Sequence, residues 1–169
     1  MELIFRSSLP APYHDAMTRL VFFNRGQRAA ETAIVQVVDR YGTPVIVAGA
    51  AGLRVVVSSR EDVQCVFALT PGAAGREPAL AGMVLFLRTS IAEIEVLHIA
   101  VADHCRRSRR AASDIVIALV QAVRASAQRL RGVERLTMAY LNGRAFQITV
   151  GSDAQLVRNG TDRVASELA

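Results

Sequence analysis

The stretch AEIEVLHIAV-ADHCRRSRRAAS-DIVIALVQAVRASAQRLRG-VERLTMAY, residues 92–140, decides the fold of this chain. It begins with an apolar run that has polar breaks, which is typical of a strand. A short basic turn follows, then a long segment with apolar residues at helical spacing, then a second apolar run. We therefore expect strand, turn, helix and strand. A helical crossover of this kind makes the two strands parallel.

The helix of this stretch is predicted over about residues 110–130. Apolar residues recur there every three or four positions, which gives one continuous stripe for packing against a sheet. The stripe consists of Ala112, Val116, Leu119, Val123, Ala127 and Leu130. Gly132 stands where a helix C-cap belongs.

Upstream of this stretch the pattern predicts a short strand, two helices and a series of strands. The helices are expected over residues 14–24 and 27–41. Residues 44–101 contain five strand-like segments joined by short turn clusters, which favours an antiparallel meander. The expected fold class is thus α/β with a mixed sheet, in which an antiparallel meander precedes a parallel strand-helix-strand unit. Residues 144–150 could form a helical turn or a strand.

Length and composition suit one folded domain over residues 1–169. The formal net charge is +5, and all 20 basic side chains are arginine. Guanidinium groups are planar forks that match phosphates and carboxylates. The charge therefore suits an anionic ligand or a nucleic acid without deciding between them.

Cysteine use and hydropathy predict a cytoplasmic protein with no membrane partner. Cys65 and Cys105 are the only cysteines, and no CxxC pair exists. The N-terminal residues lack a signal-peptide pattern, and the longest uncharged run, residues 42–53, is too short to span a bilayer. Three histidines without HxxxH spacing predict no metal site.

The basic turn before the long helix is a candidate anion site. Arg106, Arg107, Arg109 and Arg110 fall within five residues, next to a helix N-terminus. The free N–H groups and the dipole of such an end attract anions, and a cluster of cations there is unfavourable without one. The alternative is a solvated loop whose arginines pair with Asp103, Asp114 or the C-terminal tail.

At this turn the chain resembles the GNAT acyltransferase superfamily. That family has a strand ending in Val, a loop of the form Arg/Gln-x-x-Gly-x-Gly/Ala, a long helix and a strand. Here Val101 ends the strand, and Arg106 to Ala111, or Arg107 to Ala112, occupies the loop. The family's loop glycine is an arginine in this chain. The resemblance implies a GNAT-like fold and an acetyl-CoA or other acyl-CoA co-substrate.

The resemblance also implies a set of cofactor-binding residues. The loop would hold the pyrophosphate, and the strand before it would bind the pantetheine arm through its backbone, as an added strand does. The implied residues are Ile99, Ala100, Val101, Arg106, Arg107, Ser108, Arg109, Arg110, Ala111 and Ala112. Asn142 begins a turn that resembles the family's Asn-x-x-Ala turn. A Tyr often follows that turn as the acid for the leaving thiolate, but Thr149 stands at that position here.

Glu95 is the candidate general base. Some family members carry a carboxylate at its spacing from the Val that ends the strand, and a nearby carboxylate such as Glu93, on the same strand face, would raise its pKa. The alternative for Glu95 is an exposed charge at a strand end. His98 is expected on the opposite face unless a bulge intervenes, and a core role suits it better than catalysis.

The sequence therefore favours an acetyl-CoA-dependent N-acyltransferase in which an acceptor amine attacks the thioester directly. The acceptor is expected to be a small molecule or a peptide, and the strands around residues 45–59 could pair in a homodimer. One alternative is a catalytically inactive GNAT-like binding or assembly domain, suggested by the missing glycine and Tyr. Another is a toxin-like acetyltransferase directed at tRNA. Plain RNA binding is less favoured, because aromatic residues for base stacking are scarce.

Overall fold

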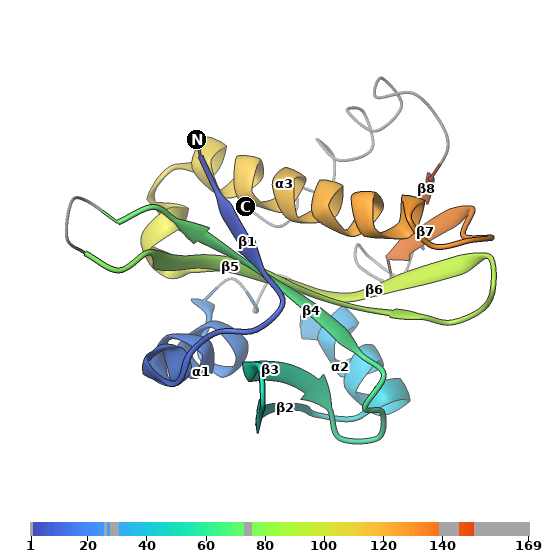
Figure 1. Cartoon of the computed structure of the whole chain (residues 1–169), viewed down its shortest axis with the longest axis horizontal. Helices are drawn as coiled ribbons and strands as arrows, with labels where there is room; N and C mark the ends of the chain where they lie inside the picture. Colours follow the sequence, from blue (N-terminus) through green and yellow to red (C-terminus); the bar gives the residue numbers. More distant parts are fainter. Residues whose placement is uncertain (1, 26, 28–30, 73–75, 139–145, 151–169) are drawn as a thin grey trace.

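The computed structural model describes residues 2–25, 27, 31–72, 76–138 and 146–150, and Figure 1 shows their arrangement. Strand β1 (Ile4–Arg6) comes first, followed by the 3-10 turn η1 (Ala11–Tyr13) and the helices α1 (His14–Phe22) and α2 (Glu31–Tyr41). Five strands then follow in succession: β2 (Pro44–Gly49), β3 (Gly52–Val57), β4 (Gln64–Thr70), β5 (Ala79–Arg88) and β6 (Glu93–Val101). The last elements are η3 (Asp103–Arg107), α3 (Arg109–Gln128), β7 (Arg135–Met138) and β8 (Phe146–Thr149).

The main sheet has six strands in the order β1-β4-β5-β6-β7-β8. Strands β4, β5 and β6 form an antiparallel meander, whereas β6 and β7 are parallel and are joined through α3. The expected fold class is confirmed: the sheet is mixed, with an antiparallel meander followed by a strand-helix-strand unit. Residues 146–149 form a strand, which resolves the alternative left open by the sequence.

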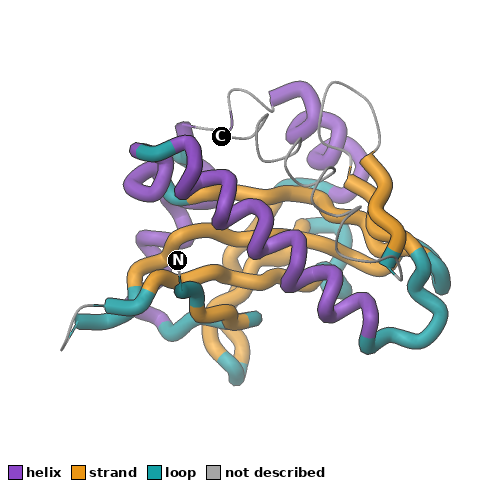
Figure 2. The backbone as a smooth tube through the Cα atoms, turned by 90° about the horizontal axis from the view of Figure 1, so that it is seen from above, coloured by secondary structure: helices purple, strands orange, loops and turns teal. Residues whose placement is uncertain are grey.

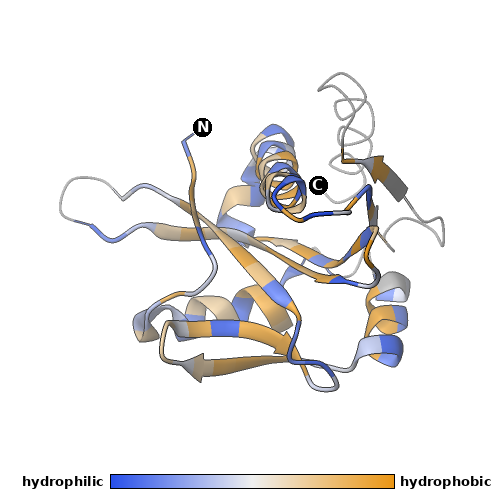
Figure 3. Cartoon of the chain, turned by 45° about the vertical axis from the view of Figure 1, so that its right-hand side comes forward, coloured by the Kyte–Doolittle hydropathy of each residue, from blue (hydrophilic) through white to orange (hydrophobic). Residues whose placement is uncertain are grey.

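Two layers cover the sheet (Figures 1 and 2). Helix α3 lies across one face and buries its apolar stripe there, including Ile115, Leu119 and Val123. Helices α1 and α2 lie on the other face over a second apolar cluster, which contains Met17, Leu20 and Phe67 among its members. Figure 3 shows that the strands between the two layers are largely hydrophobic. Among the described residues, no helix is long and apolar enough to cross a membrane.

The hairpin β2–β3 corrects the expected meander. Among the described residues, its two strands form a separate two-stranded sheet below the main one and do not join the main sheet. The hairpin is held there by the bridge between Leu9 and Leu53 and by Val55 and Val57, whose side chains are buried in the α1–α2 cluster. The hydrophobic face of the hairpin is therefore satisfied by packing rather than by lateral strand pairing. The predicted homodimer contact through residues 45–59 is not tested by the structure.

A β-bulge interrupts β6 where it passes α2. The register with β5 shifts so that Leu85 pairs with His98 while Phe86 pairs with Val96, which leaves Leu97 as the extra residue. Side chains normally alternate between faces, and one inserted residue reverses that alternation. Leu97 and His98 consequently both face α1 and α2, where they line the same small cavity. His98 therefore lies on the same face as Glu95, because the bulge intervenes.

Candidate functional site

The end of β6 presents backbone groups along its edge away from β5. The Ala102 N–H donates to the Ala81 carbonyl at 2.8 Å, and Val101 lies in register with Gly82. In an antiparallel pair the hydrogen-bonded positions alternate. The backbone groups of Ala100 therefore point towards β5, whereas those of Ile99 and Val101 point away from it. Of the three residues expected to hold the pantetheine arm, Ile99 and Val101 have the suitable orientation.

The outward edge of β6 has different neighbours at its two ends. At the start of the strand, residues 93–96 pair with β7 from Arg135 to Met138. At its end, the Val101 carbonyl accepts a hydrogen bond from Nδ2 of Asn24 at 2.5 Å. The neighbour of β6 is thus a strand at one end and a buried side chain from the segment after α1 at the other. Nothing in the sequence pattern pointed to Asn24, which lies 77 positions away and reads as a helix stop.

The predicted basic loop is largely helical. Residues 103–107 form η3, and α3 already begins at Arg109, so Arg109, Arg110, Ala111 and Ala112 belong to the first helical turn rather than to a loop. Ser108 is the N-cap, and its hydroxyl oxygen accepts from the Ala111 N–H at 3.4 Å. The N-cap therefore already satisfies one of the free N–H groups of the helix. An anion at this turn would bind mainly to the side chains rather than to that N–H group.

The arginines of this turn have different surroundings. Arg106 is half-buried and donates from Nη1 to Oδ1 of Asn24 at 3.2 Å. Arg107, Arg109 and Arg110 are exposed, and the first turn of α3 contains no acidic residue. Within the described part of the chain, Arg107 and Arg110 form no ion pair, so neither Asp103 nor Asp114 neutralises these two. The carboxylates of the C-terminal tail, the third partner that the alternative allowed, lie outside the described residues. We call Ile99, Val101, Asn24 and the arginines at 106–110 the corner site.

Glu95 is buried on the α2 side of the sheet, with 7% of its surface exposed. Its carboxylate accepts from the Tyr41 hydroxyl at 2.6 Å and from Nη1 of Arg40 at 3.3 Å. Burial, followed by the hydrogen bond to Glu95, raises the pKa of Tyr41 above its usual value. The alternative of an exposed strand-end charge therefore does not apply to Glu95. Tyr41 and Arg40, at the end of α2, were not predicted as its partners.

Glu93 does not share the environment of Glu95. Its carboxylate accepts from the Thr137 hydroxyl at 2.7 Å and from Arg135 at 3.5 Å, both on β7. The contacts of Glu93 therefore point along the sheet to β7, whereas those of Glu95 point to α2. The two carboxylates therefore have different hydrogen-bond partners, on β7 and on α2.

His98 lines a cavity of about 40 Å³ below the bulge, together with Leu97 of β6 and Ile34 of α2. Burial lowers the pKa of His98 to about 4, so its imidazole is neutral at physiological pH. A neutral imidazole among apolar side chains fits the core role that the sequence favoured.

The remaining predicted residues lie elsewhere or outside the described part of the chain. Asn142 and Tyr140 are outside the described residues. Thr149 is on β8 in register with Arg135, which itself pairs with Glu93. It therefore lies at the opposite end of β6 from the corner site. Among the described residues, no group of three or more His, Cys, Asp and Glu side chains could hold a metal ion.

Comparison with known proteins adds one distant structural likeness. No family model matches the chain, and no curated protein matches it. One solved structure that resembles it is named "a putative acetyltransferase of the GNAT family" and comes from Desulfovibrio desulfuricans. The two chains share 20% identity at a TM-score of 0.41, over 81% of this chain and 72% of the other. At this distance, function has to be argued from the residues of this chain.

Proposed function

We propose that this protein is an acyl-CoA-dependent N-acyltransferase, with acetyl-CoA as the favoured co-substrate. One observation carries the proposal. Strand β6 starts beside β7, ends beside the side chain of Asn24, and runs directly into an arginine-rich helix start. A thioester carrier requires a binding site of this kind. Its extended arm can bind along the backbone of a strand, and its diphosphate can form hydrogen bonds with guanidinium groups.

The corner site supplies complementary groups for the two parts of the carrier. The outward amides of Ile99 and Val101 suit an amide-containing arm. The exposed Arg107 and Arg110 suit the phosphates, because bidentate guanidinium contacts are among the stronger hydrogen bonds in proteins. The arginine at the position of the family's loop glycine then binds through its side chain, since Ser108 already caps the Ala111 amide.

The reaction in this proposal is direct acyl transfer. The neutral nitrogen of an acceptor amine attacks the thioester carbonyl and forms the C–N bond, and the C–S bond breaks. The amine loses one proton to a base, and the CoA thiolate takes one proton from water. Glu95 is the proposed base, acting directly or through one water. Tyr41 and Arg40 would hold its carboxylate in one orientation on the face where the bulge also places His98.

The test is release of free CoA thiol from acetyl-CoA in the presence of amines. The panel contains peptides with free N-termini, lysine peptides, polyamines, amino sugars and aminoacylated tRNA. We expect at least one amine to accelerate thiol release, and Glu95→Gln to reduce the rate about 100-fold or more, in line with general base catalysis. Glu61→Gln, an exposed carboxylate on the loop before β4, is the matched control and should keep the rate.

A second candidate is a GNAT-like binding or assembly domain without activity. It is favoured by the same corner, because Asn24 binds the Val101 carbonyl and Ser108 caps α3, so the chain's own side chains use two groups that a cofactor could use. This candidate predicts no thiol release with any amine of the panel. Acyl transfer to any one of them would exclude it.

A further inference from the structure

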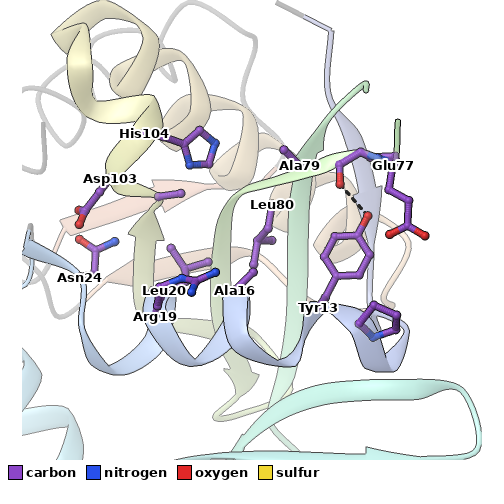
Figure 4. Close-up of a pocket in the computed structure, with 13 residues that line it drawn as sticks. Tyr13, Ala16, Arg19, Leu20, Asn24, Glu77, Ala79, Leu80, Asp103 and His104 are labelled. Atoms are coloured by element: carbon purple, nitrogen blue, oxygen red, sulfur yellow. Dashed lines mark hydrogen bonds between the residues drawn. The ribbon is translucent and has the colours of Figure 1, made fainter. Parts of the chain in front are cut away.

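A second cavity of about 460 Å³ lies between α1, the start of β5 and the turn that follows β6 (Figure 4). Its volume falls within the roughly 300–1,000 Å³ of small-molecule pockets. Apolar side chains form one wall, among them Ala16 and Leu20 of α1 and Leu80 of β5. Leu20 and Leu80 are themselves 3% and 5% exposed, so this wall belongs to the packed core.

The walls of this cavity are fixed to one another. Near the start of α1, the Tyr13 hydroxyl donates to the Pro78 carbonyl at 2.6 Å, which ties the helix to the start of β5 (Figure 4). At the other end, Asn24 lines the cavity and binds the Val101 carbonyl. These two hydrogen bonds hold α1 and the segment after it against the start of β5 and the end of β6.

Charges of both signs line the cavity without neutralising one another. Arg19 comes from α1, Asp103 from η3 and Glu77 from the segment before β5. All three side chains are exposed, and none forms an ion pair with another residue in the described ranges. In Figure 4, Arg19 extends from the helix between the ends of the cavity marked by Asp103 and Glu77. Arg19 would repel a purely cationic ligand, and the carboxylates of Asp103 and Glu77 would repel a purely anionic one.

We propose that this cavity binds a small zwitterion with an aliphatic body, of the size of a free amino acid or a dipeptide. Arg19 receives the ligand carboxylate as a bidentate fork, and Asp103 receives the ammonium group. The aliphatic body lies on the wall formed by Ala16, Leu20 and Leu80. A ligand with one charge removed leaves either Arg19 or Asp103 without a partner, which is how the site would distinguish a zwitterion from its monopolar analogues.

This cavity adjoins the corner site and shares Asn24 with it. Asn24 stands between them, since its side chain lines the cavity while its amide group holds the Val101 carbonyl of β6. The residues proposed to contact the zwitterion are not members of the corner site, so binding in the cavity requires neither acyl-CoA nor catalytic activity. The proposal goes beyond acyl transfer and stands or falls independently of it.

The test is a titration of the whole protein followed by ¹H–¹⁵N NMR, in the absence of any CoA compound. The probes are L-leucine and glycyl-L-leucine, with N-acetyl-L-leucine and L-leucinamide as analogues that lack one charge. We expect the two zwitterions to saturate below ~10 mM and to shift the amide signals of Ala16, Ala79 and Leu80. Each analogue should bind about tenfold more weakly or worse, because one charge-assisted hydrogen bond is lost.

The variants Arg19→Gln and Asp103→Asn should each weaken zwitterion binding by about tenfold or more. Arg25→Gln and Asp114→Asn alter exposed charges that do not line the cavity and should leave binding unchanged. The proposal is overturned if neither zwitterion saturates the wild-type protein, if the monopolar analogues bind equally well, or if binding survives in both Arg19→Gln and Asp103→Asn.

Discussion

At the scale of single residues, the most consequential side chain is the buried carboxylate of Glu95. Two partners from α2 meet it there, because Tyr41 and Arg40 end that helix while Glu95 lies in the middle layer on β6. A buried carboxylate is costly unless hydrogen bonds compensate for the lost water. Tyr41, which is 4% exposed, supplies the shorter of the two bonds.

We therefore expect Tyr41→Phe to destabilise the protein by about 1–3 kcal/mol, since it removes a hydrogen bond to a buried charge. Urea unfolding of Tyr41→Phe, Glu95→Ala and the double variant measures this. The two single effects should be non-additive, with a coupling of about 0.5–3 kcal/mol. Strictly additive effects would mean that the Tyr41–Glu95 contact contributes nothing.

His98 gives a pH-dependent prediction. Its pKa is about 4 in the folded protein, against an ordinary value of 6.5. Between these values the unfolded chain binds a proton that the folded chain does not, so stability falls as pH decreases from about 6.5 to 4. Above about pH 6.5 both states are neutral at His98 and this contribution is flat. The resulting decrease in the free energy of unfolding is about 3 kcal/mol at most, because each unit of pKa difference corresponds to 1.36 kcal/mol.

The measurement is the free energy of unfolding of His98→Gln and the parent protein between pH 7 and pH 4. The variant should show a shallower decline, because the buried titrating group is gone. His14→Gln, which alters an exposed histidine on α1, should keep the parent slope. An equal slope in His98→Gln and the parent would contradict the buried, neutral state of His98.

At the scale of elements, the packing of α3 on the sheet depends on Gly82 of β5. A Cβ atom at Gly82 would lie 2.8 Å from the Ala100 carbonyl oxygen and 3.0 Å from Cγ2 of Ile115. A side chain there would therefore push on both β6 and α3. Because β6 carries the corner site on its far edge, this packing also positions Ile99 and Val101.

Gly82→Ala should destabilise the protein by about 1–3 kcal/mol, as expected for overpacking of a tight interface. The fall in melting temperature should be about 2–4 °C for each kcal/mol in a chain of this size. Gly49→Ala is the control, because a Cβ atom there meets only an ordinary contact at 3.8 Å. Equal melting temperatures for the two variants would show that the α3–sheet contact is looser than described.

The elements that the sequence predicted are those with a strong local pattern. The stripe of α3, the crossover from β6 to β7 and the β4–β5–β6 meander follow from hydrophobic period and connection length. The separate hairpin β2–β3 and the bulge at Leu97 did not follow, because both are decided by which distant surface each strand meets. The roles of Asn24 and Tyr41 likewise depend on contacts across 77 and 54 positions, for which a local pattern has no signal.

At the scale of the whole molecule, the net charge is +5, all 20 basic side chains are arginine, and some of these arginines are concentrated where β6 meets α3. Arg107 and Arg110 are exposed and follow the end of β6 in the chain. At that end the outward edge of β6 no longer pairs with β7. A patch in this position suits one phosphorylated ligand with an extended arm. A nucleic-acid surface would instead spread its cations along a longer track, with aromatic side chains for the bases.

The most direct test of the acyl-CoA site is calorimetric titration of acetyl-CoA into the wild-type protein and two charge-matched double variants. Arg107→Gln with Arg110→Gln alters the corner site, and Arg54→Gln with Arg131→Gln removes the same charge from exposed positions elsewhere. We predict saturable binding to the wild type and to the control, with affinity about tenfold or more lower in the corner variant. At ~100 times the dissociation constant, acetyl-CoA should also stabilise the wild type by about 2.7 kcal/mol. Absence of binding to the wild type, or equal affinity in the two double variants, would contradict the account.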